Sequence, residues 1–308
     1  MSVNLPRLSA ACLALLALYA VYQLVTPVVR ADMASTSRPD NHGNVRVLNA
    51  KQGQVLYVTL SLPGNPLSVV GHFHNRRIPF FGTGEEGQFA ALLGIDMADE
   101  PNTLGLTAEV SYADSMRQRV IAVSVAPEVF REQRMTLPKD KVEPDAASLE
   151  RIAMEREKVQ AVFAAFTPKR LWSEPFLVPV EGTITGAFGS KRILNGQSRN
   201  QHNGEDIAAA LGTPVKATND GIVKMVDDHF FSGKGVILDH GLGLYTMYFH
   251  LDTTAVKEGD HVERGQVIGT VGKSGRATGP HLHWGAWLNG SRVNPFSLTT
   301  LPLEKARH

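Results

Sequence analysis

Cysteine is almost absent from this chain of 308 residues, and its single copy, Cys12, lies in an apolar run near the N-terminus. If that run is removed from the mature protein, neither a disulfide nor a thiolate metal site can form. Any transition metal would then be held by His, Asp or Glu side chains. An excess of one charge is also absent, because the formal net charge is +1. A chain with so little net charge does not produce the broad positive field that is typical of a nucleic-acid-binding protein. We therefore expect no nucleic-acid partner.

Long hydrophobic stretches are scarce, with one exception at the N-terminus. LSAACLALLALYAVYQLV (8–25) is nearly unbroken apolar sequence, preceded by Arg7 and followed by VVRA with Ala31 at its end. A basic start, an apolar centre and an A-x-A-like end are typical of a secretory signal peptide, here 1–31. Because a run of about 18 residues is at the lower limit for a membrane span, an uncleaved anchor is the alternative. Both interpretations take the rest of the chain out of the cytoplasm.

The first half of the remaining chain predicts a β domain and a helical connector. The polar stretch 32–44 is the expected linker. Within 45–130, TLGLTAEVSY and RQRVIAVSVA alternate apolar with polar or small residues, which predicts the strands of an Ig-like β-sandwich. In the connector 131–177, apolar residues recur at helical spacing and Asp145 is a suitable N-cap, so we expect a helix over about 146–166.

The second half predicts a glycine-rich antiparallel β domain at 178–298, followed by a tail at 299–308. Two stretches, GTPVKATNDGIVKMV (212–226) and GDHVERGQVIGTVG (259–272), share a glycine, a valine, a turn and a Val/Ile strand. This echo predicts two similar hairpins that face each other. The chain as a whole is therefore expected to be mostly β.

Two histidines one residue apart, His281 and His283, stand in the stretch TGPHLHWGAW. On a strand they would project from one face, with Leu282 turned into the core. One imidazole could then bind a metal while the other stands beside the bound water. The pattern alone is weak evidence, because VVGHFHNRR repeats it at His72 and His74 without a carboxylate cluster nearby, where we expect a solvated strand face.

A second motif, NQHNGEDIAA, places His202 and Asp206 four residues apart with Gly204 between them. The glycine would permit the chain to bend so that both side chains meet one ion. A turn stabilised by aspartate hydrogen bonds is the alternative. With His281 or His283 added, the domain offers three N and O ligands, the number in a catalytic zinc site that keeps one position open for water.

A glutamate base is not available in its usual setting, because the chain contains no H-E-x-x-H motif and the helix-borne zinc peptidase design is excluded. Histidines therefore remain as candidates for proton transfer. His250, in LGLYTMYFHLD, is expected on the same strand face as Tyr248. His240, in LDHGLG, lies at a turn and is expected to be a structural hydrogen-bonding residue. The remaining two in this domain are expected on the surface: His229 and His261.

These motifs together resemble the lysostaphin-type zinc metallopeptidases, which cleave peptide cross-bridges in peptidoglycan. The likeness rests on H-x-x-x-D, a strand histidine and G-P-H-L-H-W, and it runs in order from FGSKRILNGQSRNQHNGEDIAA (188–209) to VNPF (293–296). The resemblance implies one zinc ion bound by His202, Asp206 and His283. It implies that His250 and His281 are catalytic residues that do not bind the metal. The upstream β domain and helix resemble the accessory region of many secreted bacterial members.

The stretch before the first ligand departs from the family pattern. Members often carry a tyrosine there, whereas NGQSRNQ has none, which puts that transition-state contact in doubt. Two residues in this stretch are candidates for substrate binding. Arg192 could bind a stem-peptide carboxylate or be an ordinary surface arginine. Asn195 could instead occupy the open zinc position of a latent form, as an asparagine does in some relatives.

The resemblance implies a zinc-dependent endopeptidase that hydrolyses peptide cross-links in bacterial peptidoglycan, with stem peptides as its partners. A non-enzymatic activator of cell-wall amidases is the alternative, although all five site positions are filled here. VKEGDHVERGQVIG (256–269) also resembles biotinyl or lipoyl hairpins, in which the His/Asp group would have no purpose. A secreted chain without obvious wall-binding repeats suits the periplasm, anchored to the inner membrane if residues 1–31 are retained. That location would favour D-alanyl–diaminopimelate cross-links over glycine bridges.

Overall fold

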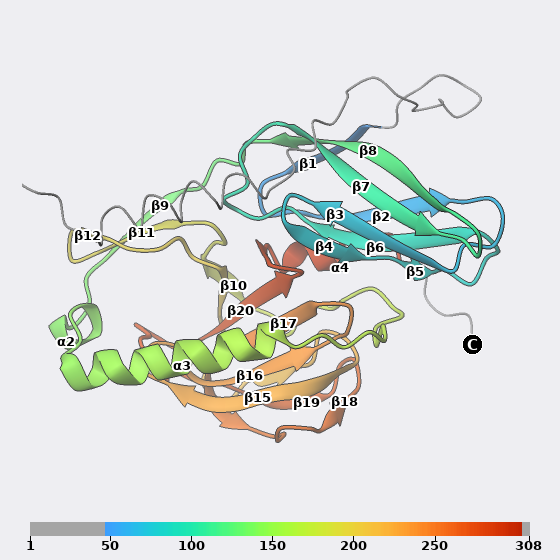
Figure 1. The fold of residues 1–308 in the computed structure, drawn as a ribbon. Helices are drawn as coiled ribbons and strands as arrows, with labels where there is room; N and C mark the ends of the chain where they lie inside the picture. Colours follow the sequence, from blue (N-terminus) through green and yellow to red (C-terminus); the bar gives the residue numbers. More distant parts are fainter. Residues whose placement is uncertain (1–46, 304–308) are drawn as a thin grey trace, which may run out of the picture. The chain divides into compact units, whose positions relative to one another are not determined.

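The computed structural model describes residues 47–303 (Figure 1). The predicted signal peptide or anchor (1–31), the linker (32–44) and the last five residues of the tail lie outside the described residues. Within the described part, strands dominate, which confirms the predicted mostly β fold. Among these residues, no helix combines the length and apolar character that a membrane span requires.

The N-terminal β domain consists of two sheets, with strand orders β1-β8-β7-β3-β4 and β2-β6-β5. The strands are β1 (Val47–Lys51), β2 (Val55–Ser61), β3 (Ser68–Phe73), β4 (Arg76–Pro79), β5 (Phe81–Gly82), β6 (Gln88–Gly94), β7 (Thr103–Ser111) and β8 (Met116–Ala126). Alternate residues of β7 are buried, as the period-two pattern predicts. The core between the sheets includes Phe73, Leu93 and Leu106, which have no exposed surface.

The connector contains strand β9 (Glu132–Met135) and helices α2 (Lys139–Val142) and α3 (Ala146–Ala164). Asp145 caps α3 by accepting a hydrogen bond from the Ser148 amide at 2.8 Å, as predicted. One stripe of α3, which includes Val159 and Phe163, packs on the sheet that contains β15, β16 and β17 (Figure 1). The Phe163 ring also stacks on Trp287 with 4.8 Å between centroids.

The C-terminal domain is a sheet with strand order β10-β13-β20-β17-β16-β15-β18, to which β14, β19 and β21 add at the sides. Its elements are β10 (Thr183–Gly186), β11 (Lys191–Leu194), β12 (Gln197–Ser198), β13 (Gly204–Ala208), β14 (Pro214–Lys216), β15 (Gly221–His229), β16 (Gly233–Asp239), β17 (Leu244–Thr254), β18 (His261–Val262), β19 (Val267–Val271), β20 (His281–Leu288), β21 (Ser291–Val293) and α4 (Phe296–Thr299). β11 and β12 form a separate hairpin with β9.

The two stretches with similar sequences pair with each other. β14 of the first stretch is antiparallel to β19 of the second, and β15 is antiparallel to β18. The two stretches therefore face each other as expected, but the expectation that each is a hairpin is wrong, because β14 pairs with β19 rather than with β15, and β18 pairs with β15 rather than with β19. Together they bury Val215, Val223, Val262 and Ile268 in the main core, beside Trp284.

His240 has no exposed surface, and its ring is held on both sides. Nδ1 lies 2.7 Å from the Asp220 carbonyl, so it carries the proton, and Nε2 lies 2.7 Å from the Thr246 hydroxyl. This confirms the structural role predicted for His240. Burial lowers the pKa of His240 to about 4.

We expect this buried neutral ring to make the fold sensitive to acid. Below about pH 6.5 the unfolded chain takes up a proton at His240 and the folded chain does not, so the free energy of unfolding falls until the pH reaches about 4. In the metal-free protein the wild type should lose about 2 kcal/mol more than His240→Gln between pH 6.5 and 5, measured by denaturant unfolding. Equal losses in both proteins would show that His240 is not the group responsible.

Candidate metal centre

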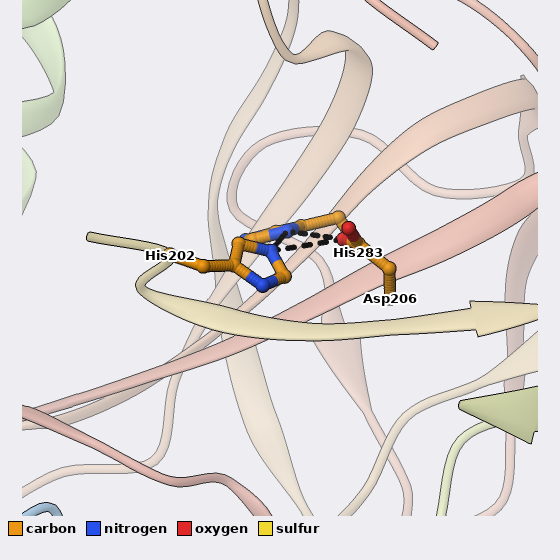
Figure 2. A group of neighbouring side chains, drawn as sticks. All are labelled: His202, Asp206 and His283. Carbon is orange, nitrogen blue, oxygen red and sulfur yellow. Dashed lines mark hydrogen bonds and ion pairs between the residues drawn. The ribbon is translucent and has the colours of Figure 1, made fainter. Parts of the chain in front are cut away.

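Three side chains, two from neighbouring strands and one from the residues just before the first of them, converge at one point (Figure 2). In the antiparallel pair β13 and β20, Asp206 lies directly opposite His283, and His202 lies two residues before β13. His202 Nε2 is 3.0 Å from Asp206 Oδ1, His283 Nδ1 is 2.9 Å from the same oxygen, and the two nitrogens are 2.9 Å apart. The structure thus brings together the three ligands that the resemblance implies.

The chemistry of these three atoms fits a bound cation. His202 Nδ1 lies 3.1 Å from the Ala187 carbonyl, which only accepts hydrogen bonds, so Nδ1 carries the proton and Nε2 presents a lone pair. Burial lowers the pKa of His202 to about 4, which keeps the ring neutral at neutral pH. Burial alone would raise the pKa of Asp206, but contacts with His202 and His283 lower it overall and keep the carboxylate ionised. Two imidazole nitrogens and one carboxylate oxygen form a donor set that suits zinc.

The second carboxylate oxygen of Asp206 is held by Arg192. Arg192, on β11, donates from a terminal nitrogen to Asp206 Oδ2 at 2.5 Å. Oδ1 is left to face the two histidines, so each oxygen of the carboxylate has a separate partner. Sequence reasoning offered Arg192 as a substrate contact, and the structure places it beside the candidate ligand.

Asn195, the other candidate for substrate binding, faces the connector. It lies at the turn between β11 and β12 with a φ of 49°. Its Oδ1 accepts from the Leu137 amide and its Nδ2 donates to the Leu137 carbonyl, both at 2.9 Å. The whole amide is therefore used to hold residue 137 against the hairpin.

His250 and His281 stand together beside the three converging side chains. Their ring centroids are 4.6 Å apart, and His281 Nε2 is 3.8 Å from Asp206 Oδ1. Each Nδ1 lies 2.8 Å from a backbone carbonyl, that of Ser274 for His250 and that of Gly279 for His281. Both Nδ1 atoms therefore donate, which leaves Nε2 of each ring as the nitrogen that could accept a proton. Burial, together with the neighbouring His281 and His283, lowers the pKa of His250 to about 3.

The expectation that His250 shares a face with Tyr248 is wrong. Tyr248 is in the main core with Trp284, whereas His250 lies beside His281. The cause is a left-handed backbone conformation at His250, with a φ of 63°, together with a register shift between β16 and β17. The simple alternation of side chains along β17 ends there.

The expected reason for Gly204 is also wrong. Gly204 lies inside β13 without a left-handed φ, so no special bend needs it. A Cβ there would instead lie 2.5 Å from the Trp284 carbonyl oxygen and 2.7 Å from His283 Nε2. Glycine is needed because the ring of a candidate ligand occupies that space.

The other histidines divide between the surface and the interior. His72, His74 and His261 are at least partly exposed, as expected; the first two lie 3.6 Å from Glu109 and 3.9 Å from Asp99. His229, expected on the surface, is only 6% exposed because its ring lies at the end of β15 against Phe249.

Comparisons with known proteins assign the chain to a family. The profile described as Peptidase family M23 matches residues 200–295. The crystal structure of a candidate peptidase M23 from Pseudomonas aeruginosa aligns with 80% of this chain and 94% of that chain, at 32% identity and a TM-score of 0.62. This chain therefore belongs to peptidase family M23.

Two curated proteins are similar over the same region. The peptidoglycan DD-endopeptidase ShyA of Vibrio cholerae is 46% identical over 93 residues, which are 30% of this chain and 22% of that protein. The DD-carboxypeptidase/endopeptidase Mpg of Neisseria meningitidis serogroup B is 45% identical over 97 residues, which are 32% of this chain and 22% of that protein. The matched region thus spans less than a quarter of the length of each relative.

Proposed function

We propose that this protein is a zinc-dependent endopeptidase that hydrolyses peptide cross-links in bacterial peptidoglycan. The observation that carries the proposal is the convergence of His202 Nε2, Asp206 Oδ1 and His283 Nδ1 within hydrogen-bonding distance of one another. These three atoms would hold one zinc ion and leave a position for water. Membership of family M23 and the names of the curated relatives support the same activity.

When bound, zinc supplies an activated water molecule and polarises the scissile carbonyl. In hydrolysis the amide C–N bond breaks, the water oxygen joins the carbonyl carbon, and a proton passes to the leaving amine. His250 and His281 would carry out the proton transfers through Nε2, because the carbonyls of Ser274 and Gly279 hold both Nδ1 protons. Once protonated, either ring would also stabilise the oxyanion.

The substrate, location and domain organisation belong to the same proposal. Peptidoglycan stem peptides are the proposed partners, and cleavage of their cross-links requires a location outside the cytoplasm, in the periplasm or secreted. The proposed units are the N-terminal β domain (45–130), the helical connector (131–177) and the C-terminal β domain that holds the candidate metal centre (178–298). The alternative, a non-enzymatic activator of cell-wall amidases, is disfavoured because the site retains all three ligand-type side chains and both additional histidines.

The test is digestion of purified peptidoglycan sacculi by the full chain, with and without a chelator, followed by mass analysis of the released muropeptides. We expect cross-linked dimers to disappear and monomers to accumulate, and we expect the chelator to stop both changes. Intact cross-links in the presence of one equivalent of zinc would contradict the endopeptidase proposal. In that case, a greater release of glycan strands by an added amidase in the presence of this chain than in its absence would support the activator alternative.

A further inference from the structure

The turn between β15 and β16, residues 230–232, is attached to helix α3, which lies beside β15 (Figure 1). The Phe230 amide donates to both carboxylate oxygens of Glu155, each at 3.0 Å. Glu155 is on α3, its side chain is only 14% exposed, and it also accepts from Arg151 Nε at 2.6 Å. Arg151 in turn donates to the Asp228 carbonyl at 2.5 Å. Glu155 and Arg151 together therefore hold the turn against the helix.

The same turn holds the backbone of His250. The Ser232 carbonyl accepts a hydrogen bond from the His250 amide at 2.9 Å. His250 has a φ of 63°, a left-handed conformation that is unfavourable for a residue with a Cβ. Such a conformation persists where the surrounding contacts enforce it, and Ser232 supplies one of those contacts. The position of the turn therefore helps to set the direction in which the His250 ring points.

The turn also holds the loop 272–280, which joins β19 to β20. The Phe231 carbonyl accepts a hydrogen bond from the amide of Arg276 in this loop at 2.7 Å. The loop carries the Ser274 carbonyl, which lies 2.8 Å from His250 Nδ1 and receives its proton. The backbone and the ring of His250 thus both depend on segments that are hydrogen-bonded to one turn.

We propose that Glu155 is a positioning residue for His250, so that helix α3 takes part in building the site. The inference rests on the proposed function, which gives His250 its role in proton transfer. Glu155 lies in the connector, outside the region matched to the family. Loss of its carboxylate would remove an acceptor from the Phe230 amide and from Arg151, and the turn would then shift.

The candidate zinc ligands are held by other contacts. Asp206 and His283 lie opposite each other in the pairing of β13 with β20, and the His202 ring is held by the Ala187 carbonyl. Zinc binding should therefore persist when Glu155 is replaced. A loss of turnover without a loss of zinc is the result that separates positioning of His250 from damage to the metal centre.

The first test measures hydrogen exchange of the His250 backbone amide in the full chain without metal. In Glu155→Ala this amide should exchange about 10-fold faster than in the wild type, because its acceptor on the turn is no longer fixed. Glu155→Gln keeps one oxygen that can accept from the Phe230 amide, and it should restore part of the protection. Val159→Ala is the matched control, because it weakens the packing of the same helix on the sheet and leaves Glu155 in place. That variant should exchange like the wild type.

The second test follows hydrolysis of cross-linked muropeptide dimers by the zinc-loaded full chain. Glu155→Ala should lower kcat about 10- to 100-fold, because a small displacement of a proton-transfer group is costly, and it should leave KM and zinc affinity unchanged. Glu155→Gln should recover part of the lost kcat. Val159→Ala should keep the wild-type kcat.

The two measurements also separate this inference from the function on which it rests. Unchanged exchange at His250 in Glu155→Ala would overturn the inference, and so would an equal acceleration in Val159→Ala. Faster exchange with a wild-type kcat would overturn it as well. If the zinc-loaded wild type hydrolyses no dimer, the endopeptidase proposal fails, and exchange at His250 alone decides whether Glu155 holds that residue. If Glu155→Ala does not fold, Glu155→Gln carries both comparisons with smaller effects.

Discussion

Replacing His283 by alanine is expected to remove both zinc binding and hydrolysis, whereas replacing His281 should remove hydrolysis alone. His283 Nδ1 lies 2.9 Å from Asp206 Oδ1, inside the group of converging atoms, and His281 Nε2 lies 3.8 Å from that oxygen, outside the group. His283→Ala should weaken zinc affinity by more than about 100-fold, measured by competition with a chromogenic chelator. His281→Ala should bind zinc normally and lose about 10²- to 10⁴-fold in kcat.

The two variants test different parts of the same assignment. His261→Ala, an exposed histidine on β18 of the same domain, should match the wild type in both measurements. Normal turnover in His281→Ala would rule out its role in proton transfer. If His283→Ala binds zinc with wild-type affinity, His283 is not a zinc ligand, and the proposed group of three ligands would be wrong.

Replacing Gly204 by alanine should damage the metal centre without changing any ligand. The added methyl group would lie 2.7 Å from His283 Nε2 and 2.5 Å from the Trp284 carbonyl oxygen. Cβ atoms in proteins essentially never approach other heavy atoms within 3.0 Å. Either the ring or strand β13 must move. We expect zinc affinity to fall about 10- to 100-fold and the free energy of unfolding to fall by about 1–3 kcal/mol.

Gly279→Ala is the matched control for this experiment. Gly279 lies two residues before His281, yet a Cβ built there would have no atom within 4 Å, and its backbone is not left-handed. That variant should bind zinc and unfold like the wild type. If Gly204→Ala also retains wild-type zinc affinity, then the close approach to His283 does not determine how the metal centre is built.

Patterns within a few residues of sequence predicted much of the fold. Alternation along β7 and the helical spacing after Asp145 depend on local backbone geometry, and the structure contains the corresponding strand and helix. The two repeated stretches do contain strands, although these strands pair between the stretches and not within them. The spacing of His202 and Asp206 likewise identified two of the three side chains that converge. The i and i+2 positions of His281 and His283 predicted that both would face the same point, because strand geometry repeats every two residues.

Contacts between distant segments could not be predicted in this way. Arg192 binds Asp206 because the backbone at Gly189 and Ser190, before β11, is hydrogen-bonded to that of His202, before β13, and no residue pattern indicates that a guanidinium would meet that carboxylate. Asn195 binds Leu137 across 58 residues because β9 pairs with β11. His229 is buried by the aromatic ring of Phe249, which a different strand supplies.

The sequence by itself determined which kinds of atoms this protein can offer a metal: imidazole nitrogens and carboxylate oxygens, with no thiolate in the described part of the chain. It also determined the strands that carry those atoms, since side-chain alternation is a local property. Only the tertiary structure decided that the left-handed conformation of His250 turns its ring toward His281, and that Gly204 leaves space for His283. Those outcomes depend on how strands far apart in sequence pack against one another, and local preference does not specify that packing.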